Sequence, residues 1–501
     1  MVIVGSGLGG LACGAILAKE GYKVLILERN KQIGGNLQTY VRERVIFDSG
    51  VHYVGGLEKG QNLYQLFTYL GIMDKIRIRK MDEDGFDTIM FRDDPVTYKY
   101  AQGYPAFIET LAKHFPDERG NIERYCGIIR EVCSKFPLYN IRTGGGLFEK
   151  MDALETDTRS FIESITANKK LQQVLAGNNL LYAGAAYKTP LYVHALILNS
   201  YVESSWRFID GGSQISKYLS REITSRNGKL LKRVNVTRFH EEDGKIQYVE
   251  DTDNKKYYGD LFISNIHPAV TLDMTDSTLI KRAYRSRIKS LENSIGTFYA
   301  NVVMKENSFP QLNHNVYYFD GQDPWAVLNY TEENWPMGFA LFCSTSSKAS
   351  DFAEGVTVMA YMRFEDVRKW EATFNTVTEE EYRGEDYDQF KTEKARILFD
   401  LVETRFPGFK AAIKSYSAAT PLSSRDYIGN RDGSLYGLTK DYRDPLKTFI
   451  SPRTKIPNLL LTGQNINLHG VLGVTVSSVL TCAQVLGMEY LVNKIRDAQD
   501  L

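Results

Sequence analysis

Apolar residues at the start of the chain fall in the order expected of strand, turn, helix and strand. An apolar run over residues 2–4 leads through glycines into an apolar helical stretch over 8–19, and a second apolar run covers 23–27. The alternative is a secretory signal peptide, which needs basic residues before its apolar run and a small-residue cleavage site after it. Only Met1 precedes the run, and Lys-Glu-Gly at 19–21 follows it. The pattern therefore predicts a βαβ unit, and we expect the native start a few residues upstream of Met1.

Glycines in the first turn of this unit match a dinucleotide-binding motif. Gly5, Gly7 and Gly10 match G-x-G-x-x-G, whose glycines permit a tight turn, close approach of a pyrophosphate and packing of helix on strand. Glu28 closes the second strand 18 residues after Gly10, where an acid accepts from a ribose 2′-hydroxyl and repels a 2′-phosphate. Unpaired N–H groups at a helix start favour an anion. The predicted pyrophosphate contacts are Gly5, Ser6, Gly7, Leu8, Gly9 and Gly10.

The loop after Glu28 indicates which dinucleotide, FAD or NAD, the unit binds. Gly34-Gly35 follows Glu28 closely, so that this stretch reads E-R-x-x-x-x-G-G. The pattern resembles the start of FAD proteins of the glutathione-reductase-like, amine-oxidase and phytoene-desaturase kinds, whereas NAD dehydrogenases run on into another crossover. A plain loop is the alternative explanation for the glycine pair. The predicted cofactor is FAD, with Glu28 on the ribose, Arg29 as a phosphate or adenine partner, and Gly34 and Gly35 as further cofactor-binding residues.

Two later stretches carry the same kind of pattern. A helical stretch over 213–226 leads to a short alternating strand at 234–236 and a hairpin at Asp243-Gly244. Near the end of the chain, an apolar strand and a glycine-rich turn precede a long helix that we expect to begin near Gly473 and Val474.

These blocks predict an α/β fold in which a Rossmann-like FAD-binding domain is interleaved with a second domain. The 501 residues exceed what one ordinary core accommodates. We expect the FAD-binding domain, of glutathione-reductase/amine-oxidase type, to comprise 1–70, 206–270 and 435–501. A discontinuous α+β substrate-binding domain would then comprise 71–205 and 271–434.

Four segments resemble one branch of these FAD proteins, the retinol saturases with their carotenoid isomerase and phytoene desaturase relatives. They are FDSGVHYVGG (47–56), Trp206 with Gly-Gly-Ser at 211–213, TPLSSRDYIG (420–429) and LTGQNINLHGVLG (461–473). The resemblance implies that the backbone of Val236 meets the adenine and that Gly463, Gln464 and Asn465 meet the ribityl chain. Asp210 replaces an expected proline and the turn at 467–469 is unusually polar; both departures concern the substrate.

Acid–base chemistry has three candidates. His52 and Tyr53 lie in a segment that, by the resemblance, passes near the flavin, and His469 lies in the final turn. Each also fits a structural hydrogen-bonding role. The helix start near Gly473 and Val474 is expected to stabilise the negative charge of reduced flavin through its dipole.

The amino-acid composition bears on which kinds of binding partner the protein has. Lysine plus arginine and aspartate plus glutamate both number 61, which gives no electrostatic case for nucleic acid. Five scattered cysteines without C-x-x-C favour a reducing cytosol and no metal site. No apolar run reaches the ~18 residues of a spanning helix. The basic stretch 280–290 is either a solvated helix face or a peripheral contact with anionic lipid.

The predicted function is FAD-dependent reduction of a double bond in a long apolar polyene or isoprenoid, by resemblance to retinol saturase, with NAD(P)H or another reductant as electron donor. Carotenoid isomerase, desaturase and amine-type oxidase are alternatives on the same fold. A non-catalytic prenyl- and protein-binding module, like the Rab GDP-dissociation inhibitors, is a further alternative. The substrate tunnel is expected from 180–198 and 325–342, with space left by the small residues at 183–186, although buried core elements would have the same pattern.

Overall fold

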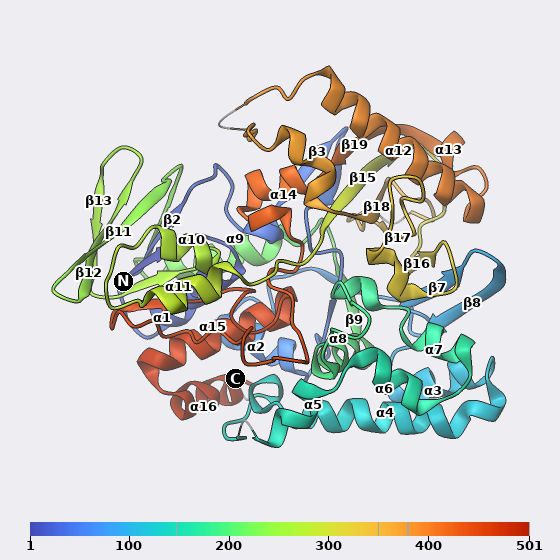
Figure 1. Ribbon diagram of the computed structural model, residues 1–501, viewed down its shortest axis with the longest axis horizontal. Coiled ribbons are helices and arrows are strands. Elements are labelled where there is room, and N and C mark those ends of the chain that lie inside the picture. Colours follow the sequence, from blue (N-terminus) through green and yellow to red (C-terminus); the bar gives the residue numbers. More distant parts are fainter. Residues whose placement is uncertain (147, 349, 378–379, 500–501) are drawn as a thin grey trace.

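A five-stranded parallel sheet forms the centre of the nucleotide-type part of the molecule. In the computed structural model, which describes residues 1–146, 148–348, 350–377 and 380–499, its strand order is β10-β2-β1-β14-β20 (Figure 1). Because every pair is parallel, the five carboxyl ends meet at one edge of the sheet. The strands are β1 (Val2–Val4), β2 (Leu25–Glu28), β10 (Lys229–Lys232), β14 (Phe262–Ser264) and β20 (Leu459–Leu461).

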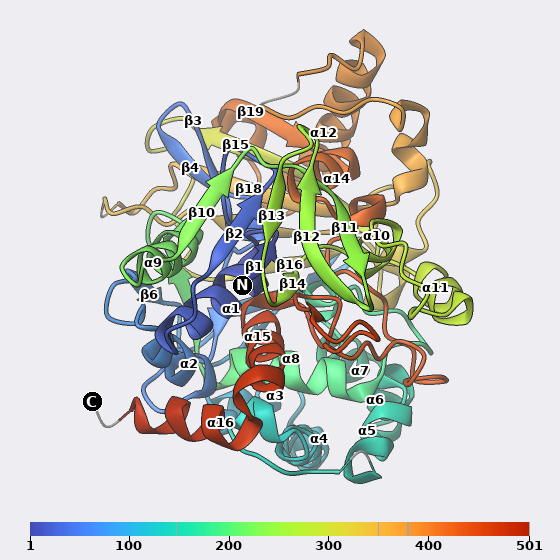
Figure 2. The same ribbon diagram turned by 90° about the vertical axis from the view of Figure 1, so that its left-hand side faces the viewer.

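Alternate residues of these short strands face different layers. Ile3 and Ile26 pack in one apolar cluster with the long helices, whereas Val2 and Leu27 pack in another with a small antiparallel sheet. Successive side chains of a strand point to opposite faces of the sheet, so even a three-residue strand contributes side chains to both layers. The helices are α1 (Leu8–Lys19), α9 (Ser213–Thr224) and α15 (Gly470–Leu486), and the small sheet is β11 (Val236–Glu242), β12 (Lys245–Asp251) and β13 (Lys256–Tyr258). Figure 2 shows this sheet in front of β1 and β2.

The expected βαβ unit and the hairpin at Asp243-Gly244 are confirmed, with β2 beginning at Leu25. Two expectations are wrong. The short strand expected at 234–236 is displaced: β10 ends at Lys232 and β11 begins at Val236, and the Lys-Leu-Leu-Lys sequence of β10 has a weak apolar signal. The long helix near the end of the chain, α15, begins at Gly470, three residues before the expected start at Gly473, because the glycine-rich stretch expected to be a turn forms its first helical turn.

A seven-stranded mixed sheet supports the second half of the molecule. Its order is β19-β15-β18-β17-β16-β7-β8, and its inner strands are buried along their whole length. One face packs against α12 and the other against a group of helices that includes α4 and α8 (Figure 1). The strands are β7 (Asp87–Phe91), β8 (Asp94–Tyr100), β15 (Gly296–Met304), β16 (Asn315–Phe319), β17 (Gly338–Cys343), β18 (Gly355–Met362) and β19 (Ile413–Ala419).

The remaining elements cover these two sheets. Two small sheets are β3 (Thr39–Arg42) with β4 (Val45–Asp48), and β5 (Val54–Gly55) with β9 (Ser205–Phe208) and β6 (Ile78–Lys80). None of the helices in the described part of the chain combines the length and apolar composition needed to cross a bilayer. The other helices are α2 (Asn62–Leu70), α3 (Tyr104–Ala112), α4 (Arg119–Ser134), α5 (Met151–Glu155), α6 (Thr158–Ile165), α7 (Lys169–Leu175), α8 (Leu191–Glu203), α10 (Pro268–Asp273), α11 (Arg282–Lys289), α12 (Glu385–Arg405), α13 (Phe409–Ala412), α14 (Pro421–Ile428) and α16 (Met488–Asp497).

Arg207 joins the small sheet of β9 to the seven-stranded sheet. Its side chain is buried and donates to the carbonyl oxygens of Cys343 and His314 and, over 2.8 Å, to Asn315 Oδ1. A buried guanidinium is stable only when acceptors surround it. The two halves are therefore connected by a polar anchor as well as by apolar packing.

Candidate functional site

The glycine-rich turn forms a cradle at the carboxyl end of β1. Gly5 has φ +93, a left-handed conformation that glycine adopts without strain. A Cβ on Gly10 would lie 2.1 Å from the carbonyl oxygen of Gly5, so only glycine lets α1 approach the turn. The loop closes over the turn because Gly34 N donates to Ser6 O over 3.0 Å. Because Gly5, Gly7 and Gly9 carry no side chains of their own, the turn exposes backbone to the space in front of it.

Glu28 is held rigidly beside this cradle. Its Oε2 accepts from the backbone N of Ser6 (2.9 Å) and from Ser6 Oγ (2.6 Å), and its Oε1 accepts from Asn30 N (2.8 Å). An ionised carboxylate offers about four acceptor positions, which leaves one for a ligand hydroxyl. Arg29 points elsewhere: its guanidinium donates to Asp426 O (2.8 Å) and lies over the ring of Phe374. Arg29 therefore anchors α14 in addition to lining the site.

The cradle opens into a cavity of about 260 Å³. Most of the predicted cofactor residues line it, and two do not: Gly10 lies behind the turn, and Gly473 lines a neighbouring cavity. The predicted residues on the wall are Gly5, Ser6, Gly7, Leu8, Gly9, Glu28, Arg29, Gly34, Gly35, Val236, Gly463, Gln464, Asn465 and Val474.

Asn265 is a cradle residue that the sequence reasoning missed. It follows β14, and its amide group lies against the turn, where Nδ2 donates to Gly5 O over 3.4 Å. The last two residues of α14 and the turn that follows it (together 427–430) also line the cavity. A signal existed for Asn265, because residues just beyond the carboxyl ends of parallel strands face the ligand crevice. No comparable rule points to the turn after α14.

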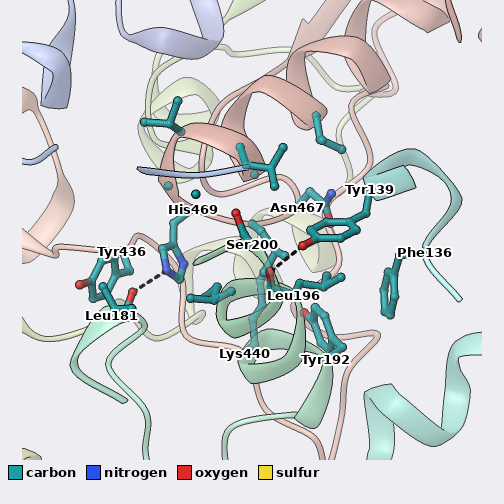
Figure 3. Close-up of a pocket in the computed structure, with 18 of the residues that line it drawn as sticks. Phe136, Tyr139, Leu181, Tyr192, Leu196, Ser200, Tyr436, Lys440, Asn467 and His469 are labelled. Carbon is teal, nitrogen blue, oxygen red and sulfur yellow. Dashed lines mark hydrogen bonds between the residues drawn. The ribbon is translucent and has the colours of Figure 1, made fainter. Parts of the chain in front are cut away.

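An apolar cavity of about 470 Å³ adjoins the cradle (Figure 3). The two cavities share six lining residues, so they lie directly beside each other. Two of the six belong to the first turn of α15, whose free N–H groups lie at the junction. The shared residues are Gly50, Val51, Leu435, Tyr436, Gly470 and Val471.

The tunnel prediction is partly wrong. From 180–198, five residues line the apolar cavity: Leu180, Leu181, Tyr192, Leu196 and Ile197. From 325–342, only Phe342 does so, because β17 is an inner strand and Trp325 packs into the core. The small residues at 183–186 do not line it. The missing part of the wall comes from 136–144 and from the loop 435–449.

The three predicted acid–base residues all line the apolar cavity. His52 stacks on Phe342, and burial lowers its pKa to about 3, so it is neutral; no described residue pairs with its Nε2. Burial likewise lowers the pKa of His469 to about 4. His469 Nε2 donates to Leu181 O over 3.1 Å, which leaves Nδ1 as an acceptor (Figure 3). Neither histidine supplies a proton as imidazolium near neutral pH.

Tyr53 is part of a buried relay that the sequence did not reveal. Its hydroxyl lies 2.9 Å from Asp87 Oδ2 and 2.7 Å from the hydroxyl of Tyr317. Burial raises the pKa of Asp87 to about 7, although bonds from Asn315 and Tyr53 oppose that shift. Asp87 is thus a carboxyl group that exchanges its proton near neutral pH, placed directly behind a hydroxyl on the cavity wall.

Known proteins match this chain over nearly its full length. Residues 3–70 match the NAD(P)-binding Rossmann-like domain family. The chain is similar to all-trans-retinol 13,14-reductase of Homo sapiens, with 25% identity covering 97% of this chain and 85% of that protein. It is 24% identical to prolycopene isomerase 2, chloroplastic, of an Oncidium hybrid cultivar, covering 87% of this chain and 74% of that protein. The predicted resemblance to retinol saturases and carotenoid isomerases is confirmed.

Solved structures agree on the architecture. An oxidoreductase from Methanosarcina mazei superposes with a TM-score of 0.63 at 16% identity, covering 95% of this chain and 98% of that chain. Wild-type putrescine oxidase gives 0.64 at 13% identity, covering 97% and 98%. This confirms the amine-oxidase-like α/β fold. Fold, cradle and relatives together define an oxidoreductase of the dinucleotide-binding class.

Proposed function

We propose that the protein binds FAD and reduces a carbon–carbon double bond of a long apolar polyene or isoprenoid. The observation that supports this is the junction of the two cavities: a polar glycine cradle meets an apolar space at the first turn of α15. The cradle suits a dinucleotide because Gly5, Gly7 and Gly9 leave backbone exposed in front of Glu28. Bound FAD would supply two-electron chemistry at the double bond.

In this proposal the chain orients the substrate, excludes water and delivers a proton. The apolar wall holds the polyene against the junction, and Tyr53 hands its hydroxyl proton to the substrate carbon. Asp87 then returns a proton to Tyr53 across their 2.9 Å contact. Net reduction also requires an external electron donor, for which NAD(P)H is the first candidate to test.

One competing reaction, a redox-neutral isomerisation, follows from the relatives, because prolycopene isomerase 2 is also similar to this chain, at 24% identity over 87% of it. Product mass separates the two. Purified protein would be examined for flavin absorbance, reduced anaerobically and incubated with a panel of polyenes. A gain of two hydrogens supports the proposal, whereas unchanged mass with altered double-bond geometry would replace it by an isomerase, and a colourless protein would refute FAD binding.

We also propose that the mouth of the apolar cavity rests on an anionic lipid surface. Leu446 and Phe449 line the cavity and remain half exposed. The basic helix α11 lies beside them, because Arg287 Nη1 donates to Lys447 O (2.7 Å) and Phe449 O (3.2 Å). Apolar tips flanked by cations suit anionic membranes. Co-sedimentation with phosphatidylserine vesicles should weaken in Phe449→Ser, and equal binding by both proteins would refute this contact.

A further inference from the structure

The apolar cavity contains a lysine for which the described wall residues provide no counter-charge. Lys440 lines the cavity from the loop 435–449, and Figure 3 draws it among Leu181, Tyr192 and Leu196. The lining includes two other cations, Arg142 and Lys150. Among the described residues that form this wall there is no aspartate or glutamate.

The hydrogen bonds of Lys440 leave most of its capacity unused. Its Nζ donates to the carbonyl oxygen of Thr448 over 3.2 Å, which uses one of three N–H donors. The neighbouring acid, Asp441, is engaged with Arg443 instead. Burial lowers the pKa of Lys440 to about 8, and no carboxylate opposes that shift.

An ammonium held in a partly buried, apolar cavity without an anion costs free energy, and that cost falls when a ligand supplies the anion. We propose that the substrate of this cavity is an apolar chain that ends in a carboxylate, and that Lys440 pairs with this carboxylate. This rests on the proposed function and specifies its substrate class. The reacting double bond would lie toward the junction with the cradle, and the carboxylate toward the loop 435–449.

Other head groups fit the charges less well. An alcohol would accept a hydrogen bond but would leave the ammonium uncompensated. A diphosphate carries more negative charge than one ammonium neutralises. Arg142 is exposed and Lys150 lies over the ring of Phe136, so neither adds a buried charge beside Lys440. A single cation inside the cavity therefore selects a monoanion.

The test measures binding, not turnover. Dissociation constants would be determined by quenching of tryptophan fluorescence for the acid, the methyl ester and the alcohol of one C20 polyene, and for a C20 prenyl diphosphate. In Lys440→Met we expect affinity for the acid to fall about tenfold or more, the size of a charged hydrogen bond, with the ester unchanged. Lys440→Arg should retain the preference for the acid. Lys447→Met, which changes an exposed lysine outside the lining, is the matched control.

Each outcome decides the matter. Equal affinity of the wild-type protein for acid and ester, or an unchanged acid affinity in Lys440→Met, would overturn the assignment, and so would tighter binding of the diphosphate. Flavin absorbance and melting temperature are recorded for every variant. A protein without flavin that still discriminates acid from ester through Lys440 would refute the proposed function and leave this inference standing.

Discussion

In the proposed mechanism, single residues behind the cavity wall decide whether Tyr53 can donate a proton to the substrate. If Asp87 is protonated, it donates to Tyr53, which is then free to donate onward; if Asp87 is ionised, Tyr53 donates to it and points away from the cavity. Tyr53 was a candidate from its motif, but its partners were not. Asp87 is 34 residues away and Tyr317 is 264 residues away, and no local pattern connects them.

We expect the turnover rate to fall as pH rises through about 7, because the protonated form of Asp87 reloads Tyr53. Charged or polar groups around it include Arg207, whose pKa burial lowers, Tyr317, whose pKa burial raises further above its usual value, and Asn315, which does not titrate. Asp87→Asn cannot reload Tyr53, so its rate should fall about 100-fold, a typical loss for general acid catalysis. A pH–rate profile checks both effects.

Asp84→Asn is the matched control, because Asp84 is exposed and pairs with Lys99 outside the cavity. The relay would be wrong if Asp87→Asn kept the descending limb of the profile. A merely structural role for Asp87 would lower the rate without removing that limb.

At the scale of elements, the predictable parts were those whose signals are local. The strand, glycine turn and helix over residues 2–19 follow from contiguous residues. The strand placed at 234–236 was wrong, because an edge strand with flanking lysines carries little apolar signal. The predicted start of α15 was three residues too late because glycine is common both in turns and at helix starts. The close packing of Gly473 on Leu468, which the sequence does not show, distinguishes the two.

Replacing Gly7 by valine should give a folded protein that lacks most of its flavin. A Cβ there meets only the amide group of Asn265, at 2.9 Å, so the fold can adjust. The added branches would occupy the cradle where backbone must meet the pyrophosphate. Absorbance of the purified variant and its melting temperature would test this, with Gly321→Val as control, because a Cβ at Gly321 meets nothing within 4 Å. Full yellow colour in Gly7→Val would contradict the placement of the cofactor.

A negative charge in the first turn of α15 should lower the reduction potential of the bound flavin. Val471 is the suitable position because it lines both cavities, whereas Val474, one turn later, lines only the cradle side. An adverse interaction of about 1.4 kcal/mol corresponds to about 30 mV for a two-electron couple. Redox titration of Val471→Asp and of neutral Val471→Asn would show a lower potential in the former alone. Identical potentials would mean that α15 does not face the redox centre.

At the scale of the whole molecule, both large sheets are assembled from distant segments. β1 lies between β2 and β14, and β7 pairs with β16. Each sheet therefore combines strands from the first and the second half of the sequence. Sequence patterns located the three nucleotide-type blocks because each carries its own apolar strand. They could not place β7 and β8 beside β16, since that pairing depends on contacts far apart along the chain.

Cutting the chain near residue 205 should therefore give two fragments that do not fold alone. Residues 1–205 would contain β1 without its neighbour β14, and β7 without β16, leaving open sheet edges that aggregate. Residues 206–501 would lose the cradle and would leave β10 without β2, β14 without β1 and β16 without β7. We expect both fragments to be insoluble when expressed separately and to recover some solubility when expressed together. This is the behaviour of interleaved domains, in which 1–70, 206–270 and 435–501 form one unit and the intervening residues the other. A soluble fragment 1–205 with a cooperative unfolding transition would show instead that the first half is an independent domain.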